Sequence, residues 1–505
     1  MVFSSLIFLF RFLPAVMIVY KIVPPRVKNA ALFFMSLIFY AWGEPVYVWL
    51  MVFSAAADFG HGLLVGHFLE QGQKCRARWA LISSVTVNLA LLGFFKYGDF
   101  FLRLAGSILG RKFAPMNLTL PVGISFYTFQ TMSYTIDVYR GEVPVQKNFW
   151  DFGCYVAMFP QLIAGPIVRF KTIASQLKGR KLSAGLFAQG LTRLTVGMAK
   201  KVLLANNAGR LWKDVLGGRY GADPLAAWLG AAAFGFQIYF DFSGYSDMAI
   251  GLGKMLGFVF PENFNYPYIS QSLTEFWRRW HITLGQWFRE YVYIPLGGSR
   301  NHPVRNIAVV WLLTGLWHGA ALNFVLWGIY FCILLLIEKF LLGEWQQRWP
   351  SWLRRVYTLA AVFFGWMIFA CQDMAAFTRQ IGAMFGMAGA DSGVVPGMLH
   401  GLAGGAVLAR SHGAAGLLEP GNAALAGSGI YALYTNALLF VAMIFGATPL
   451  PARLASRLMA RLHRSDPRFL AAALSLKIVA GLSAWSLCLA ELVDMTYNPF
   501  LYFRF

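Results

Sequence analysis

The chain has 505 residues, of which 58% are hydrophobic and 13% are charged, and it carries 43 Lys and Arg against 22 Asp and Glu. An average soluble domain has roughly 25% charged residues, so this composition excludes a soluble globular protein. The basic residues occur in short clusters between apolar runs, at 21–28, 74–78, 169–181, 278–305 and 453–468. Such clusters mark cytoplasmic loops under the positive-inside rule, so the excess positive charge indicates membrane topology and not nucleic-acid binding.

Long apolar runs predict membrane-spanning helices, because roughly 20 apolar residues are needed to cross the hydrocarbon core. The candidate spans are residues 2–22, 29–43, 45–66, 79–97, 225–251, 306–338, 355–371, 430–447 and 470–493. The first run has no basic n-region and no small-residue cleavage site, so we expect a retained helix and not a signal peptide. Placing the basic loops at 21–28 and 68–78 inside puts the N-terminus outside, and the basic loop at 103–112 would then face outward.

The region 98–205 breaks this pattern, because Pro121, Pro160, Pro166 and many glycines interrupt it. Interrupted helices at membrane depth need cover from protein or a water-filled cavity, so we expect a central pore or re-entrant region, with Gln130 and Gln161 shaping it. Residues 372–429 are rich in Gly and Ala and predict short helices or loop. No internal repeat or soluble domain is evident, so the chain is predicted to be one all-α, polytopic membrane domain over residues 1–505.

Several chemistries find no support in the sequence. The five cysteines, at 75, 154, 332, 371 and 488, form no Cys-x-x-Cys pair and no metal-binding spacing with His, so we assign no disulfide and no metal. The chain lacks a Walker loop, a Gly-x-Ser-x-Gly elbow and a His-Glu-x-x-His motif. These absences argue against a serine nucleophile and a phosphate cradle.

Residues 274–291 have the pattern of one interfacial amphipathic helix. One side carries Trp277, Trp280, His281, Leu284, Trp287, Phe288 and Tyr291, and the other carries Glu275, Arg278, Arg279, Gln286, Arg289 and Glu290. The simplest interpretation is an anchor at the cytoplasmic headgroup layer, with Glu275 and Arg279 as an ordinary i,i+4 pair. A histidine on the aromatic side has no headgroup to reach. The alternative is therefore that this side lines a cavity into which His281 points.

His318 lies near the middle of the apolar run 306–338, with Thr314 one turn before it. A titratable group at such depth is costly, which makes it a functional candidate. Gly315 and Gly319 would let another backbone or an acyl chain approach closely. One interpretation is a core histidine hydrogen-bonded between helices. The other is a general base, because burial favours a neutral imidazole that can take a proton from a hydroxyl group.

Asp241 and Asp247 lie toward the end of the apolar run 225–251. The simplest interpretation is helix-end capping and packing against a basic partner, such as an Arg of the segment 278–289. The alternative is that these carboxylates orient a catalytic histidine or gate a cavity.

The blocks Trp277-Arg-Arg-Trp-His281 and Gly315-Leu-Trp-His-Gly319 resemble the paired histidine motifs of the membrane-bound O-acyltransferase (MBOAT) family. Within that family the chain is similar above all to the bacterial alginate O-acetyltransferase membrane subunits. This similarity rests on Met1-Val-Phe-Ser-Ser5, residues 120–130, Tyr134-Thr-Ile-Asp-Val-Tyr-Arg-Gly141, Ala164-Gly-Pro166, residues 239–251, Glu262-Asn-Phe-Asn265 and Asn498-Pro-Phe-Leu-Tyr-Phe-Arg-Phe505. It runs nearly end to end and weakens only in 372–429, where specificity could differ.

The resemblance implies a ring of transmembrane and re-entrant helices around a central funnel, with residues 270–330 as its catalytic core. It places His318 at the narrow centre, as general base or acyl-transfer residue. It places His281 nearer the cytoplasmic mouth, where it assists or positions the donor. The further candidates for the substrate tunnel are Trp317, Thr314, Asn323, Trp280, Asp241 and Asp247.

The resemblance also implies an enzyme of the bacterial inner membrane that passes an acetyl group across the bilayer for O-acetylation of an exported polysaccharide such as alginate. The expected donor is a cytoplasmic acetyl thioester, acetyl-CoA above all, with no bound cofactor and no assigned cofactor-binding residues. The chain shows no soluble domain that could hold a polymer. We therefore expect an extracytoplasmic SGNH-type acetyltransferase and the polysaccharide assembly machinery as partners, besides the lipid bilayer.

Alternatives to this function remain open. The acceptor could be peptidoglycan or cellulose, or teichoic acid as in a related aminoacyl-transfer branch. A transporter would also use broken helices and polar pore residues, but it would usually show inverted repeats and charged mid-membrane sites, and neither is evident. A purely structural membrane subunit gives no reason to bury His318.

Overall fold

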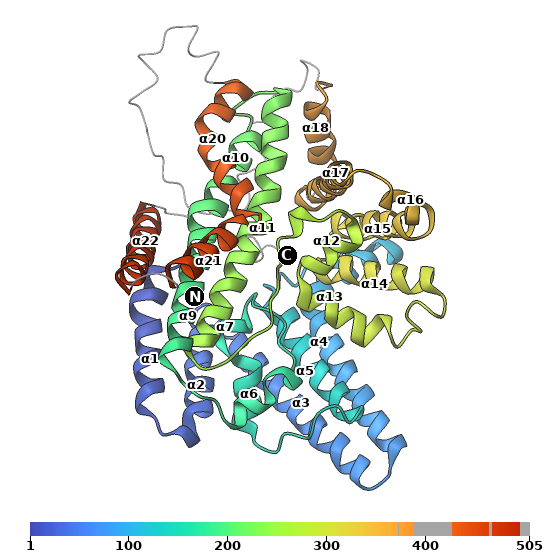
Figure 1. Ribbon diagram of the computed structural model, residues 1–505. Coiled ribbons are helices and arrows are strands. Elements are labelled where there is room, and N and C mark those ends of the chain that lie inside the picture. Colours follow the sequence, from blue (N-terminus) through green and yellow to red (C-terminus); the bar gives the residue numbers. More distant parts are fainter. Residues whose placement is uncertain (372, 388–426, 464–466, 495–505) are drawn as a thin grey trace.

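The structure is a computed structural model that describes residues 1–371, 373–387, 427–463 and 467–494 (Figure 1). Within these ranges every regular element is helical. Seven helical segments are long and apolar enough to cross a membrane: Tyr47–Glu70, Lys74–Leu109, Pro224–Met255, Leu322–Gln347, Ser351–Ala370, Gly429–Gly446 and Ala473–Asp494. The predicted all-α, polytopic membrane fold is thereby confirmed.

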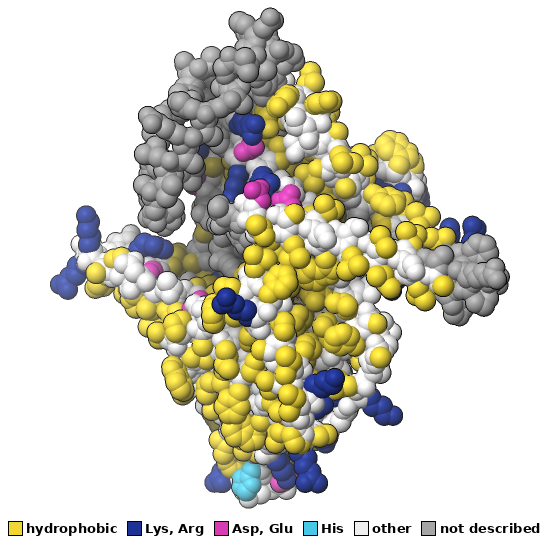
Figure 2. Space-filling model, turned by 90° about the vertical axis from the view of Figure 1, so that its left-hand side faces the viewer, with side chains coloured by type: hydrophobic (Ala, Val, Ile, Leu, Met, Phe, Trp, Pro, Cys, Tyr) yellow, Lys and Arg dark blue, Asp and Glu magenta, His cyan; other side chains and the backbone are white. Residues whose placement is uncertain are grey.

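The N-terminal part forms two antiparallel helix pairs (Figure 1). The first pair consists of the π-helical turn η1 (Phe8–Phe12), α1 (Leu13–Ile22), η2 (Pro25–Val27) and α2 (Lys28–Ala41), and the second of α3 (Tyr47–Glu70) and α4 (Lys74–Leu109). Both basic connections lie at the lower ends of their pairs in Figure 1. Figure 2 shows Lys, Arg and His side chains at the lower tip of the molecule, beneath a largely hydrophobic face, and further Lys and Arg side chains higher on the same face. The positions of the two connections agree with the prediction that the basic loops 21–28 and 68–78 lie on the same side.

Short helices follow, as predicted, but the interruption begins after Leu109 and not at 98, because α4 continues without a break to that residue. They are α5 (Ile124–Tyr139), α6 (Phe149–Ala157), α7 (Phe159–Leu162) and α8 (Phe170–Lys178). Gly123 precedes α5 with a positive φ of 78°, and a Cβ there would lie 2.5 Å from the carbonyl oxygen of Leu162. Only glycine fits such a backbone and such a close approach. Gln130 and Gln161 are buried in α5 and α7.

A buried carboxylate ties α5 to the helix pair α3–α4. Asp58 on α3 accepts hydrogen bonds from Ser84 (2.6 Å) and Asn88 (2.7 Å) of α4. Thr131 of α5 in turn donates to the Asn88 side chain over 3.1 Å. A buried polar group costs free energy unless it is hydrogen-bonded, so this network fixes how the three helices pack.

A second bundle is built on α9 (Ala184–Ala199), η3 (Lys200–Ala205), α10 (Asn206–Leu216) and α11 (Pro224–Met255). Glycines let α9 and α11 approach closely. A Cβ on Gly197 would lie 2.5 Å from the carbonyl oxygen of Gly244, and one on Gly190 would lie 2.6 Å from that of Gly251. Small residues at such crossings are typical of helices packed in membranes, where van der Waals contact drives association.

The C-terminal half holds the two histidine blocks and the remaining helices. They are η4 (Pro267–Ile269), α12 (Leu273–Arg279), α13 (Ile282–Phe288), η5 (Arg289–Tyr293), α14 (Pro303–His318), α15 (Leu322–Ile337), η6 (Glu338–Leu342), α16 (Gly343–Gln347), α17 (Ser351–Ala370), α18 (Met374–Met384), α20 (Gly429–Gly446), α21 (Leu450–His463) and α22 (Pro467–Asp494). Most of the segment 372–429 and the motif 498–505 lie outside the described residues.

Candidate active site

His318 is the last residue of α14, and α15 begins at Leu322. The run 306–338 is therefore a helical hairpin, and the prediction of one spanning helix with His318 near its middle is wrong. Gly319 ends α14 with an extended backbone (φ 171°). The break places His318 at the C-terminal end of α14.

Glycines allow α14 and α15 to pack closely in this hairpin, as predicted for Gly315. A Cβ on Gly315 would lie 2.5 Å from the carbonyl oxygen of Phe324, and a Cβ on Gly328 would lie 2.6 Å from that of Trp311. The two backbones therefore touch directly near the turn. The close approach that the sequence predicted is between α14 and α15.

Aromatic rings surround His318, which is 8% exposed. The ring centroids of Trp317, Phe369 and Trp327 lie 5.0, 5.1 and 5.2 Å from its imidazole. Phe324 lies at 6.2 Å. An environment of this kind excludes water and favours the uncharged imidazole.

Two side chains of α4 cap the end of α14. Lys96 donates through Nζ to the carbonyl oxygen of Trp317, and Tyr97 donates through its hydroxyl group to that of Leu316. The last carbonyl groups of a helix have no partner within the helix, so these donors satisfy them. Sequence analysis missed both residues. The sequence placed Lys96 at the end of the run 79–97, but the spanning helix continues to Leu109, which puts the lysine at a depth where charge is rare.

His318 opens into a narrow cavity of about 50 Å³ that Lys96 also lines. Val122 and Ile163 are shared with a cavity of about 400 Å³ that Met1 lines, and Lys96 is shared with a third cavity of about 200 Å³. The N-terminus lies at the end of α1 opposite its basic loop (Figure 1). The cavity of about 400 Å³, which Met1 lines, is therefore on the side of the membrane that we predict to be the exterior.

His281 lies between α12 and α13 with a left-handed backbone (φ 42°). The prediction of one continuous helix over 274–291 is therefore wrong. The aromatic side predicted for it does face inward, because Trp280, Leu284 and Trp287 are buried together with His281. The break matters because a positive φ is rare for a non-glycine residue and costs free energy that its surroundings must offset.

Asn263 fixes the ring of His281. Nδ1 of the histidine lies 3.0 Å from Oδ1 of Asn263, which also accepts from the backbone N–H of Thr283 at 3.3 Å. Because a backbone N–H can only donate, that Asn263 atom is the oxygen, so His281 must donate through Nδ1. The Asn263 amide donates to Ser246 of α11 (3.1 Å). Nε2 of His281 is buried without a hydrogen-bond partner in the described structure, so in the neutral ring its lone pair is available to a ligand.

Trp317 links the two histidines. Its ring centroid lies 6.0 Å from that of His281 and 5.0 Å from that of His318. Phe126 and Phe129 of α5 contact the same indole at 5.6 and 5.9 Å. The indole of Trp317, a predicted tunnel residue, therefore lies between the two histidines and against the buried helix α5.

A much larger cavity, of about 1460 Å³, lies on the other side of α12 and α13. Its lining includes the cations Arg278, Arg289, Lys339 and Arg354, none of which forms an ion pair with a described residue. Three acids line the same cavity: Glu275 and Glu338 are engaged elsewhere, and Glu344 forms no ion pair with a described residue. Glu275 pairs with Arg279 (2.8 Å), and Glu338 accepts from the backbone N–H groups of Leu273 and Thr274 at 2.7 and 2.9 Å. The unpaired cations suit a ligand with several negative charges.

Tryptophans form the wall between this cavity and His318. Trp277 and Trp311 line the cavity, and their ring centroids lie 5.5 and 5.8 Å from that of Trp327. Trp327 contacts His318 on its other side. His318 thus has the narrow cavity on one side and, on the other, a wall of aromatic residues that separates it from the large cationic cavity.

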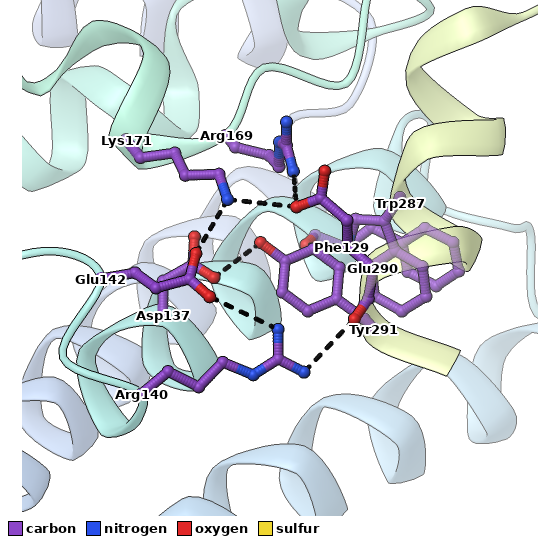
Figure 3. A network of polar contacts seen from close by, with 9 residues as sticks. All are labelled: Phe129, Asp137, Arg140, Glu142, Arg169, Lys171, Trp287, Glu290 and Tyr291. Atoms are coloured by element: carbon purple, nitrogen blue, oxygen red, sulfur yellow. Dashed lines mark hydrogen bonds and ion pairs between the residues drawn. The ribbon is translucent and has the colours of Figure 1, made fainter. Parts of the chain in front are cut away.

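A stacked pair and a polar network hold the far end of α13 against α5 (Figure 3). The rings of Trp287 and Phe129 stack with 3.8 Å between centroids, and the Trp287 indole donates to the Phe129 carbonyl oxygen (2.9 Å). Tyr291 donates to Asp137 of α5 over 2.8 Å. These contacts fix the helix that follows His281.

Charged groups extend this network (Figure 3). Lys171 pairs with Glu142 (2.9 Å) and Glu290 (3.1 Å), Arg169 pairs with Glu290, and Arg140 lies 3.8 Å from Glu142. The hydrogen bond from Lys171 holds the pKa of the Glu142 carboxyl below its usual value. Partial burial by itself would lower the pKa of Lys171, but hydrogen bonds to two carboxylates outweigh it and raise that pKa. Sequence analysis found the polar side that carries Glu290 but not these partners.

Asp241 and Asp247 lie apart from the space around His318. Asp241 pairs with Lys201 (2.6 Å), and Asp247 pairs with Arg193 (2.6 Å) and Lys200 (2.7 Å). The predicted basic partners exist, but they come from α9 and η3. The suggestion of an Arg from the segment 278–289 is therefore wrong, because α11 packs along α9 over its length.

The remaining tunnel candidates are all near the histidines but in different roles. Asn323 donates to the carbonyl oxygen of Phe369 (3.0 Å), which joins α15 to α17. Thr314 bonds its own helix at Val310 (2.7 Å). Trp280 packs on Trp366 with 4.7 Å between centroids. Among the described residues no group of three His, Cys, Asp or Glu side chains could hold a metal ion.

The fold and the site thus define a helical membrane protein with two buried histidines packed against one tryptophan. The chain belongs to the membrane-bound O-acyltransferase family, whose model matches residues 143–378, and it is an O-acyltransferase.

Similar proteins indicate to which branch of the family the chain is most similar. A "Probable alginate O-acetylase AlgI" of Pseudomonas aeruginosa is 44% identical over 394 residues, covering 76% of this chain and 75% of that protein. A protein of the same name from Azotobacter vinelandii is 43% identical over 394 residues, covering 76% and 78%. A peptidoglycan O-acetyltransferase of Helicobacter pylori is 33% identical over 427 residues, covering 77% and 80%. The chain is thus similar to O-acetyltransferases that are named for two different polymers.

Proposed function

We propose that this protein takes an acetyl group from a cytoplasmic acetyl thioester and transfers it at His318 to a hydroxyl group, for O-acetylation of an exported polysaccharide such as alginate. The observation that carries the proposal is the position of His318 between a narrow cavity and an aromatic wall backed by a large cationic cavity. The similarity to proteins named as alginate O-acetylases supports acetyl as the group and alginate as the polymer.

The donor would bind as a substrate in the cationic cavity. Acetyl-CoA suits it, because phosphate groups pair well with arginine and lysine, and the four unpaired cations line one continuous space. The basic segments 278–305 and 169–181 support a cytoplasmic orientation of this side. This orientation supports a location in the bacterial inner membrane.

In this reaction the two histidines have separate roles. His318 acts as the general base, because it lies in an apolar cage beside the narrow cavity. His281 offers a fixed Nε2 lone pair, which can accept a hydrogen bond from the donor and position its acyl end. General-base assistance is typically worth about 10² to 10⁴ in rate.

The acetyl group would then pass to an extracytoplasmic SGNH-type partner enzyme that works with the polysaccharide assembly machinery. No soluble domain is present in the described ranges that could hold a polymer chain. The cavities beside His318 are small, at about 50, 200 and 400 Å³. A single hydroxyl-bearing side chain or sugar fits such spaces better than a folded polymer does.

The test compares the acetyl content of surface polysaccharide in a deletion strain complemented with wild type or with His318→Ala. We expect acetylation only with wild type, at matched amounts of protein in the membrane. Normal acetylation with His318→Ala would overturn the proposal. Measuring peptidoglycan acetylation in the same strains distinguishes the second candidate acceptor, which the Helicobacter relative favours.

Reconstitution tests the relay. Purified protein in liposomes receives acetyl-CoA and alginate, with or without the candidate partner. Acetylation that requires the partner supports the relay, whereas efficient acetylation by this protein alone contradicts it.

A further inference from the structure

Lys96 shares the narrow cavity with His318, and among the described residues it is the only other basic residue that lines it. No carboxylate in the described ranges forms an ion pair with it. Asp99, one turn later on α4, instead accepts a hydrogen bond from the backbone N–H of Met116 (2.7 Å). A charge at membrane depth without a counter-ion is costly and is rarely found without a function.

The simplest role for Lys96 is to cap α14. Its ammonium group donates to the carbonyl oxygen of Trp317 and lies 5.8 Å from the centroid of that indole. Yet an ammonium group has three N–H donors, and capping uses one. Tyr97 already shows that a neutral hydroxyl group can cap the neighbouring carbonyl. Capping therefore explains a donor at position 96 but not a positive charge.

We propose that Lys96 is a catalytic residue whose ammonium group stabilises the negative charge that develops on the acyl carbonyl oxygen beside His318. This inference rests on the proposed function. In the transfer the acceptor hydroxyl oxygen forms a bond to the thioester carbonyl carbon, and its proton moves to His318. The carbonyl π electrons move to the oxygen, which faces Lys96. The C=O bond then re-forms, the C–S bond breaks, and the thiolate leaves with the proton from His318.

The site favours a charged stabiliser at this position. Preformed donors aimed at a developing oxyanion act most strongly where water is excluded. The cavity is only about 50 Å³, and aromatic rings close the other side of His318. A cation already fixed to the end of α14 needs little rearrangement during the reaction.

The experiment measures transfer from acetyl-CoA in proteoliposomes, with the acceptor that supports wild-type activity. Lys96→Gln keeps a hydrogen-bond donor but removes the charge, Lys96→Met removes both, and Lys96→Arg keeps both. Tyr97→Phe removes the neighbouring cap and serves as the matched control for capping. We expect kcat to fall by about 10²- to 10³-fold in Lys96→Gln and Lys96→Met, the scale for losing one oxyanion donor. KM for acetyl-CoA should stay within about twofold, because the interaction forms only in the transition state.

Lys96→Arg should recover at least about tenfold over Lys96→Gln, since charge is what matters, and Tyr97→Phe should stay close to wild type. Wild-type kcat in Lys96→Gln would overturn the inference. Equal losses in Tyr97→Phe and Lys96→Gln, with equal losses of thermal stability, would also overturn it, because capping would then explain both. His318→Ala separates the two proposals: if that variant is active the proposed function fails, and if it is inactive only Lys96 is in question.

Discussion

His281 and His318 both contact the ring of Trp317, but different forces position them. His281 lies in a strained turn between two short helices, and Asn263 fixes its tautomer through a buried hydrogen bond. His318 lies at a helix end that glycines and aromatic rings hold in place. A directed hydrogen bond suits a group that must present one lone pair to a ligand. An apolar cage suits a base that must exchange a proton within the reaction.

The largest effect is expected from removing His318. His318→Ala should lower transfer by about 10²-fold or more, from the usual scale of general-base catalysis. His281→Ala should instead give a graded loss, seen as a higher KM for the donor. Steady-state kinetics of the two variants, with size-exclusion profiles as the control for folding, checks the comparison. Complete loss in His281→Ala with unchanged donor binding would place both histidines in the chemical step.

The stability of the protein should depend strongly on close packing within the α14–α15 hairpin, which carries His318. Gly315→Val forces the α14 backbone away from the Phe324 carbonyl oxygen, which a Cβ would meet at 2.5 Å. We expect a loss of about 1–3 kcal/mol in stability, the usual cost of overpacking, together with reduced activity. Gly481→Val on α22 is the matched control, because a Cβ there meets nothing within 4 Å. Thermal unfolding of both variants in detergent measures the difference, and equal midpoints would contradict it.

Asn263 provides a test of the hydrogen-bonded histidine. Asn263→Ala leaves His281 without its tautomer-fixing acceptor, so we expect a loss of activity of about tenfold, the equivalent of one net hydrogen bond. Because the two residues act together, the double variant with His281→Ala should be no worse than His281→Ala alone. Additive losses in this double-mutant cycle would show that Asn263 acts independently of His281.

The smallest effect is expected in the ion network near Tyr291. The lowered pKa of Glu142 means that its stabilising contribution is present above its ordinary pKa and is lost as pH falls through the lowered value. The raised pKa of Lys171 means that its contribution is present below its ordinary pKa and is lost as pH rises through the raised value. At these half-exposed positions the contribution is less than about 1 kcal/mol.

Glu142→Gln should therefore lower the unfolding temperature slightly at neutral pH. It should also make the unfolding temperature fall less as the pH is lowered. Thermal unfolding from acid to neutral pH, compared with wild type, measures this. If the unfolding temperature of the variant falls with pH just as that of wild type does, the Glu142 carboxylate does not contribute to the loss of stability in acid.

The sequence predicted the membrane fold well wherever the signal lies within one short stretch of the chain. Apolar runs such as 45–66 and 225–251 became α3 and α11, because hydrophobicity over about 20 residues is sufficient to define a span. The predictions failed where the chain breaks a helix without proline. At His281 and at Gly319 the apolar pattern continues through the break, and periodicity therefore could not reveal it.

The sequence by itself determined that this is a membrane protein, that the basic loops 21–28 and 68–78 lie on the same side, and that His281 and His318 are the exceptional residues. These are consequences of composition and of the cost of placing titratable groups in lipid. Only the tertiary structure decided that Trp317 joins the histidines, that Asn263 orients one and that Lys96 lies beside the other. Those contacts join segments far apart in the chain, since Lys96 and Trp317 are separated by 221 positions, and helix packing alone brings them together.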